Sequence, residues 1–304
     1  MKERDLEAEL IRTLCAHVGE RLPSEQVASF VAFVRQYYHW IPAADLADSS
    51  EAELFGAALA HWKLARWRPA GTTKVKVYNP HLEQHGWQSP HTVVEIVSDD
   101  MPFIVDSVTM ELTRQGCGID LVIHPVIRVR RDGAGELVEV LEPGATSPDM
   151  RSESVIHAEV VREPDPQRLS ELRSGIERVL GQVRAAVEDW QAMRGQALTL
   201  MEEIELRPPE LDPDELSEAN SFLRWLAEDH FTFLGYREYD LVADEHAAGL
   251  RAIPDSGLGI LRGTPVTPYT KLHPDALELA REPHLLLLAK ANSRASVHRP
   301  AYLD

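Results

Sequence analysis

Apolar residues recur every three or four positions through the first 68 residues, which is the spacing of amphipathic helices. Three helices are expected there. Their apolar stripes are Leu6, Leu10, Leu14 and Val18; Val27, Phe30, Val31 and Val34; and Leu54, Ala58, Trp62 and Ala65. Ser24 is the expected cap of the second helix, and Ser50 with Glu53 forms a capping box before the third. A proline interrupts the pattern within 68–71, so we expect a boundary there.

Alternation of apolar and polar residues then replaces the helical spacing and predicts strands. The expected strands span 74–78, 91–97, 119–131, 137–141 and 154–161. A helix is expected over 102–115, and a long helix over 165–194 opens on Asp165-Pro166 and ends before Gly195. This mixture predicts an α+β fold.

A proline-rich linker, RPPELDPD at 207–214, precedes a further helix and a second set of strands. Those strands are expected at 231–241, 250–253, 257–262 and 284–291. The chain is therefore expected to comprise a helical segment (1–70), a sheet unit with a long C-terminal helix (71–196) and a second α/β unit (197–304). The final residues, HRPAYLD, carry no polar tail, and we expect this last unit to be truncated.

Composition excludes several classes of function. The 304 residues carry a formal net charge of −18, which argues against nucleic-acid binding because phosphate contacts need clustered Lys and Arg. Only two cysteines occur, in different contexts, as in a reducing cytoplasm. No apolar run approaches the ~20 residues of a membrane helix. We expect a cytoplasmic protein with no membrane partner.

No motif predicts a catalytic, cofactor-binding or metal-binding residue. Gly257, Gly259 and Gly263 lie in GLGILRG. A dinucleotide loop requires a strand before it and a helix after it, and neither is expected here. HLEQH at 81–85 has two histidines at the spacing of a zinc motif, but Leu82 stands where a zinc protease has glutamate, and Pro80 and Gly86 favour a surface loop. Ser296 and His298 have no orienting acid nearby, so we interpret them as structural.

The turn that joins strand 91–97 to helix 102–115 is the candidate effector site. It comprises Ser98, Asp99, Asp100, Met101, Pro102 and Phe103. A helix N-terminus favours carboxylates, and the two aspartates could hold an ammonium group, so an amino acid would suit the turn. The alternative is that both aspartates only cap the helix.

Several segments of the chain, in the same order, carry a resemblance to a known family. VVEIVSDDMPFIVDSVTMEL followed by GIDLVIHPVIRVRR resembles the first ACT-type domain of the large bacterial NAD-dependent glutamate dehydrogenases. HFTFLGYREYDL, GLGILR and LAKANSRASVHRPAYLD agree with that family in the same order. The similarity covers nearly the whole chain, although residues 1–70 carry it weakly.

The resemblance implies an N-terminal regulatory segment of such an enzyme. It implies an ACT-like, ferredoxin-like βαββαβ-type antiparallel sheet with helices on one face, then a second unit that is PAS-like or ACT-like. The full-length parent would oxidise L-glutamate to 2-oxoglutarate and ammonium with NAD as acceptor, while this chain holds no catalytic residue and no cofactor. The implied partners are the parent's own catalytic domain and other subunits of a homo-oligomer, and the resemblance also implies that the segment takes part in allosteric regulation.

Two alternatives remain open at this point. In the first, the chain is an amino-acid-sensing module that binds a small effector at 98–103. In the second it is a pure assembly scaffold, with the 165–194 helix making subunit contacts. ACT domains often have glycine after the proline of this turn, whereas Phe103 follows Pro102 here, and its ring is expected to fill the pocket.

Overall fold

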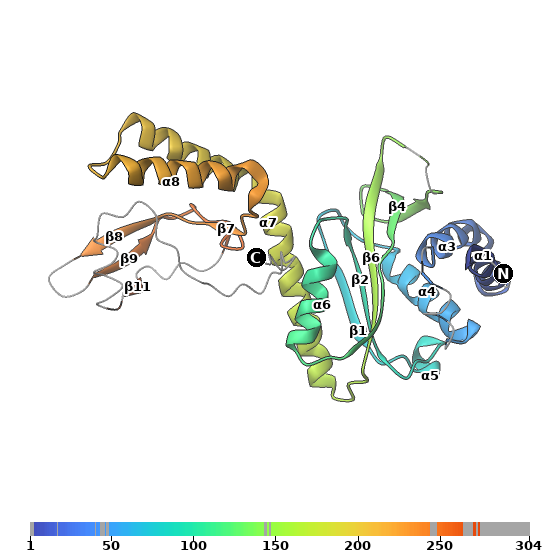
Figure 1. The fold of residues 1–304 in the computed structure, drawn as a ribbon. Helices are drawn as coiled ribbons and strands as arrows, with labels where there is room; N and C mark the ends of the chain where they lie inside the picture. Colours follow the sequence, from blue (N-terminus) through green and yellow to red (C-terminus); the bar gives the residue numbers. More distant parts are fainter. Residues whose placement is uncertain are drawn as a thin grey trace. The chain divides into compact units, whose positions relative to one another are not determined.

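A computed structural model describes residues 3–16, 18–39, 41–42, 46, 49–142, 145, 147–243, 248–263, 270–271 and 273. The chain divides into two compact units, Met1–Leu180 and Gly181–Asp304, which are treated separately below. The elements of each unit can be followed in Figure 1. The predicted strand at 284–291 and the Ser296–His298 pair lie outside the described residues.

The first unit begins with helices α1 (Glu3–Ala16), α2 (Val18–Arg21), α3 (Ser24–Tyr37) and α4 (Glu51–Ala65). The capping box of α4 is confirmed: the Ser50 hydroxyl accepts from the Glu53 amide, and the Glu53 carboxylate accepts from the Ser50 amide at 2.8 Å. The predicted cap of α3 is wrong. Ser24 is the first helical residue, and Pro23 before it makes no side-chain cap.

An antiparallel sheet follows, with strand order β1-β2-β6-β4-β5 and with β3 also paired to β6. Its strands are β1 (Lys74–Tyr78), β2 (Thr92–Asp99), β3 (Ile119–Ile123), β4 (Val126–Arg131), β5 (Leu137–Val140) and β6 (Met150–Val160). The single strand expected over 119–131 is broken, because His124 and Pro125 separate β3 from β4. Proline has no amide N–H to donate to a neighbouring strand, and the Pro125 carbonyl instead accepts from the Val155 amide at 3.1 Å.

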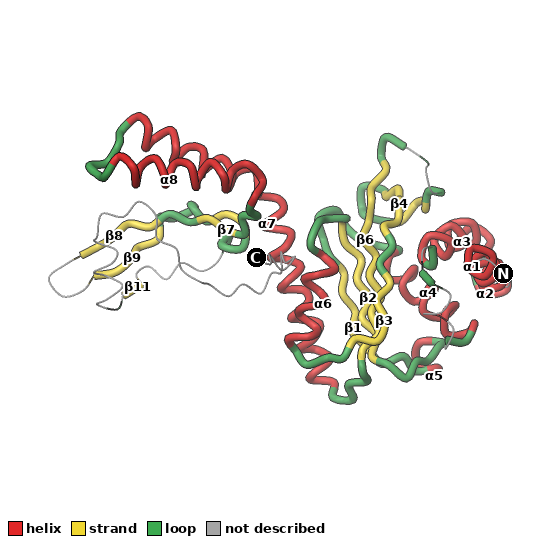
Figure 2. The backbone as a smooth tube through the Cα atoms, in the orientation of Figure 1, coloured by secondary structure: helices red, strands yellow, loops and turns green. Residues whose placement is uncertain are grey.

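Helices cover both faces of this sheet, as Figure 2 shows. Helices α6 (Ile104–Arg114) and α7 (Pro166–Leu206) lie on one face, as expected for an ACT-like unit. Helices α3 and α4 pack on the other face, where they share one apolar core with Val97, Ile127 and Val155. The expectation of helices on one face only is therefore incomplete, since the N-terminal helices fold onto the sheet.

The strand order also modifies the predicted βαββαβ pattern. The elements from β2 to α7 form a βαββα unit. In this unit β3 and β4 together take the place of one strand, because both pair with β6. In a βαββαβ sheet the last strand pairs with the first. Here β1, which precedes the unit in sequence, occupies that place and pairs antiparallel with β2. One edge strand of the sheet is therefore β1, which comes before the βαββα unit in the sequence.

A cluster of polar side chains is buried between the sheet and helices α3 and α4. The Tyr37 hydroxyl lies 3.0 Å from His61 Nδ1, and His61 Nε2 lies 3.1 Å from the Ile96 carbonyl oxygen. The Tyr78 hydroxyl donates to Glu95 at 2.9 Å. Burial lowers the pKa of His61 to about 3, and burial raises the pKa of Glu95. His61 is therefore neutral inside the protein at neutral pH.

HLEQH forms a short helix, α5 (Leu82–His85), and the predicted surface loop is wrong at this point. The His81 amide donates to His85 Nδ1 at 3.0 Å, which closes one helical turn, and Gly86 ends it in the left-handed region at φ 75°. No group of three or more His, Cys, Asp or Glu side chains that could hold a metal ion occurs in the described part of the chain.

The second unit is built on the remainder of α7, with α8 (Pro213–Trp225), a π-helical turn (Leu226–His230) and short strands. The strands are β7 (Gly235–Tyr236), β8 (Tyr239–Ala243), β9 (Ala248–Ala252), β10 (Leu258–Gly259) and β11 (Thr270–Lys271). α7 does not end before Gly195 as predicted, because Met193, Ala197 and Met201 continue its buried stripe. No helix among the described residues combines the length and apolar character that a membrane crossing demands.

Gly56 is required by the packing of α4. A Cβ at this position would lie 2.2 Å from the Cβ of Trp87. Gly56→Ala should therefore destabilise the protein by about 1–3 kcal/mol through overpacking, although alanine is the better helix former. Gly181→Ala is the matched control on α7, since a Cβ there meets nothing within 4 Å. Urea unfolding should show stabilisation or no change for Gly181→Ala, and equal effects of the two changes would contradict this packing argument.

Neutral His61 makes stability depend on pH. The pKa of His61 is about 3 in the folded protein against 6.5 as its ordinary value, so between these values only the unfolded chain binds the proton. The free energy of unfolding should fall as pH falls from about 6.5, by up to about 1.4 kcal/mol per pH unit. Glu95 acts oppositely, because its raised pKa lowers stability as pH rises above 4.5.

Urea titrations at pH 7 and pH 5 test the histidine contribution. His61→Gln should show a smaller stability loss between the two pH values than the unmodified protein. The control is His81→Gln, at an exposed position, which should keep the original dependence. An unchanged pH profile in His61→Gln would exclude His61 as its source.

Candidate functional site

The predicted effector turn is folded differently from the expectation. β2 ends at Asp99 and α6 begins at Ile104, two residues later than predicted. Phe103 occupies the N-cap position with φ 70° and makes no side-chain cap hydrogen bond. This left-handed conformation costs a non-glycine residue roughly 1–2 kcal/mol. The aspartates therefore do not cap the helix through that position, and the capping interpretation is wrong there.

Each acidic or hydroxyl side chain of the turn has its own environment. Ser98 is buried and donates to the carbonyl oxygen of Asp99 at 3.1 Å. The Asp99 carboxylate accepts from Arg68 at 2.7 Å. Asp100 and Pro102 are exposed, and Phe103 is half-buried. The turn thus offers one engaged and one exposed carboxylate, and effector binding at 98–103 stays a prediction.

Arg68 belongs to a buried ionic network whose centre is Glu153. Arg131 donates to both Glu153 oxygens, at 2.6 and 2.7 Å, and Arg68 donates to the same carboxylate at 2.7 Å. The side chains of all three residues are at most 1 % exposed. Burial alone would lower the pKa of Arg68, but its hydrogen bonds to Asp99 and Glu153 raise it. Asp99 completes the charge balance of two arginines and two carboxylates.

Backbone carbonyls accept further hydrogen bonds from both guanidinium groups. Arg68 donates to the Thr72 carbonyl at 2.8 Å, and Arg131 donates to those of Ala65 and Gly135 at 2.7 and 2.9 Å. Gly135 has φ 92°, and a Cβ there would lie 2.5 Å from the carbonyl oxygen of Arg68. The network therefore ties the end of α4 to three strands, which is a structural rather than a catalytic arrangement.

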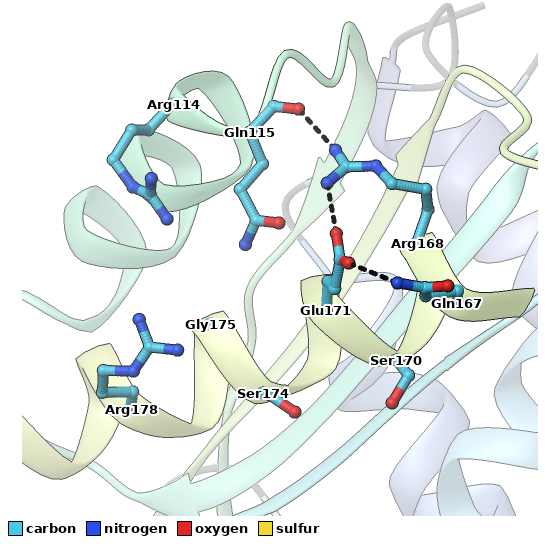
Figure 3. A pocket seen from close by; sticks show the side chains of 9 residues that line it. All are labelled: Arg114, Gln115, Gln167, Arg168, Ser170, Glu171, Ser174, Gly175 and Arg178. Carbon is cyan, nitrogen blue, oxygen red and sulfur yellow. Dashed lines mark hydrogen bonds and ion pairs between the residues drawn. The ribbon is translucent and has the colours of Figure 1, made fainter. Parts of the chain in front are cut away.

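A polar groove between α6 and α7 was not predicted from the sequence. It has a volume of about 580 Å³, and Figure 3 shows the side chains around it. Its lining residues are Arg114, Gln115, Gln167, Arg168, Ser170, Glu171, Ser174, Gly175 and Arg178. All of them lie in the first unit. The groove is within the size range of small-molecule sites.

Two of the three arginines of this groove are already paired. Arg114 binds the buried Glu111 through two hydrogen bonds, at 2.6 and 2.7 Å, and this contact lowers the pKa of Glu111. Arg168 donates to Glu171 at 2.7 Å, and Glu163 lies 3.9 Å from it. Arg178 makes no hydrogen bond or ion pair with any residue that the structure describes.

Gly175 lets the two helices approach at the floor of the groove. A Cβ at this position would lie 2.3 Å from both Gln115 Nε2 and Glu111 Oε1. Gln115 Nε2 in turn donates to Glu111 Oε1 at 2.8 Å. Because the lining comes from two helices separated by the strands β3 to β6, no local motif signals it. The absence of a side chain at Gly175 within a regular helical stripe was the only available hint.

The GLGILRG loop does not fit the phosphates of a nicotinamide dinucleotide. The backbone N–H of Gly259, the central glycine of GLGILRG, donates to the Asp189 carboxylate at 2.8 Å and so is not directed at a phosphate. β10 leads into a turn at Ile260–Gly263, whereas a dinucleotide loop opens a helix. A Cβ on Gly259 would also lie 2.2 Å from the Leu234 carbonyl oxygen, which explains this glycine by packing.

Comparison with known proteins identifies similar sequences. Residues 33–176 match the family model described as glutamate dehydrogenase, ACT1 domain. The chain is 36 % identical over 307 residues to an NAD-specific glutamate dehydrogenase of Halomonas elongata and 37 % identical over 305 residues to one of Pseudomonas aeruginosa. Each alignment covers 99 % of this chain, which spans only 19 % and 18 % of those relatives. A Mycobacterium tuberculosis protein of the same description is 29 % identical over 86 % of the chain.

Loss of the Glu153 charge should destabilise the first unit strongly. Glu153→Gln leaves Arg68 and Arg131 buried without their shared carboxylate, so it should cost about 3–5 kcal/mol in the free energy of unfolding. The control is Glu139→Gln, which breaks an exposed 2.9 Å ion pair with Arg130 and should cost less than about 1 kcal/mol. Urea unfolding compares them, and a small effect of Glu153→Gln would show that the network contributes little.

Proposed function

The chain belongs to the NAD-specific glutamate dehydrogenase family and spans less than a fifth of the length of its Halomonas and Pseudomonas relatives, and we propose that it is a non-catalytic regulatory and assembly segment. The whole enzyme would oxidise L-glutamate with water to 2-oxoglutarate and ammonium, and would reduce NAD⁺ to NADH. The observation that carries the proposal is the ACT1 match over 33–176, which includes the sheet and helix α6.

The arrangement of the described residues supports a non-catalytic role. The buried Arg68–Glu153–Arg131 network is closed to solvent, and its hydrogen-bonding groups are engaged with one another. GLGILRG does not open a helix. The chemistry is therefore assigned to other parts of the enzyme, together with NAD. We also place the enzyme in the cytoplasm and interpret the second unit as PAS-like.

Assembly is the second component of the proposal. The second unit exposes several large apolar side chains, which would mark a contact between proteins where they form a contiguous patch. They are Trp190, Leu200, Leu206, Trp225 and Phe231, and between 41 and 81 % of each is exposed. The proposed partners are the remainder of the enzyme and other subunits of a homo-oligomer.

The purified chain should not convert glutamate. In the presence of L-glutamate and NAD⁺, absorbance at the NADH band should stay at the level of a protein-free control, because the proposal assigns hydride transfer to other parts of the enzyme. A full-length relative, assayed in parallel, is the positive control. Glutamate-dependent NADH formation by the chain itself would overturn the non-catalytic assignment.

A further inference from the structure

One arginine of the groove between α6 and α7 forms no ion pair within the described residues, although its charge helps to lower the pKa of Glu111. Arg114 is held by Glu111, and Arg168 is held by Glu171. Arg178, one of the lining residues, makes no hydrogen bond or ion pair with the described residues. In a chain with a formal net charge of −18, an unpaired guanidinium beside two other arginines is a site for an anion.

The groups around this space set the geometry of an anion. Figure 3 shows Arg114 and Gln115 on α6 and Arg178 on α7, with their polar ends turned into the space above Gly175. A planar guanidinium binds a carboxylate through two parallel hydrogen bonds, which favours an organic acid over a spherical ion. Arg178 can bind one carboxylate in this way, and Arg114, whose Nε and Nη2 hold Glu111, can add a hydrogen bond from Nη1.

Gln115 adds a requirement of its own. The neighbouring Glu111 is ionised, since Arg114 keeps its pKa low, and an ionised carboxylate only accepts hydrogen bonds. Gln115 must therefore turn its NH₂ group to Glu111, as the 2.8 Å contact shows. Its side-chain carbonyl oxygen is left to accept from a donor in the groove. A ligand with a hydroxyl group beside its carboxylate can donate to this oxygen.

We propose that the α6–α7 groove binds a small hydroxycarboxylate, with its carboxylate on Arg178 and Arg114 and its hydroxyl on Gln115. The site lies away from the 98–103 turn, at the opposite end of α6. The ligand links α6 to α7, and α7 is an uninterrupted 41-residue helix that continues into the second unit. The proposal that the groove binds this ligand does not rest on the proposed function, whereas a role of the ligand as an effector does.

Titration of the purified 304-residue chain with sodium lactate, at constant ionic strength, tests the site. The arginine Nε–Hε signals in NMR spectra provide the dissociation constant and report directly on the guanidinium groups. Arg178→Gln should weaken lactate binding about tenfold or more, as expected for a charge-assisted hydrogen bond. Arg173→Gln is the matched control, because Arg173 lies on α7, pairs with Glu177 at 3.7 Å and does not line the groove. Its affinity should change less than about twofold.

Ligand variation separates the proposed chemistry from general anion binding. Propionate lacks the hydroxyl and pyruvate lacks the donor hydrogen, so both should bind about two- to tenfold more weakly than lactate. Equal binding of lactate and propionate would overturn the role of Gln115. Inorganic phosphate binding as tightly as lactate, binding that survives Arg178→Gln unchanged, or no binding of lactate would each overturn the proposal. None of these outcomes depends on glutamate oxidation, so they are distinct from failure of the proposed function.

Discussion

Three charged side chains buried at the end of the sheet constrain much of the first unit. Glu153 lies on β6, Arg131 on β4 and Arg68 just beyond α4, and their side chains are almost inaccessible to solvent. A buried charge is tolerated only where partners and hydrogen bonds replace water. These elements must therefore meet in one register, and Asp99 at the end of β2 is drawn into the same network. The acidic turn is positioned by this requirement.

The N-terminal helices cover one face of the sheet and complete its apolar core. Phe30, Trp62 and Val97 belong to one apolar core, so the helical segment and the sheet are parts of one compact unit. Within it, the buried His61 and Glu95 side chains form hydrogen bonds with Tyr37 and Tyr78. The opposite face is left to α6 and α7, and the polar groove forms where these two helices meet at Gly175.

Local signals in the sequence predicted those elements whose stabilisation is local. The capping box at Ser50 depends on neighbouring residues and is found in the structure, and β1 spans the predicted residues 74–78. The end of α7 was missed because a glycine costs a helix only about 1 kcal/mol, which burial of Met193 and Met201 offsets. The start of α6 was missed because Phe103 takes a left-handed conformation that no propensity favours.

The sequence by itself determined the α+β class, the main helices and strands and the family, because periodicity and ordered motifs are properties of contiguous residues. Tertiary structure decided what the chemically active side chains face. Asp99 was predicted from its position to cap a helix or hold a ligand, yet Arg68 pairs with it across 31 residues of chain. Arg114, Gln115 and Arg178 converge only because two helices pack on one face of the sheet. Charged side chains pair with the groups that are nearest in space, and the distance between two side chains in the fold cannot be read from their separation in the sequence.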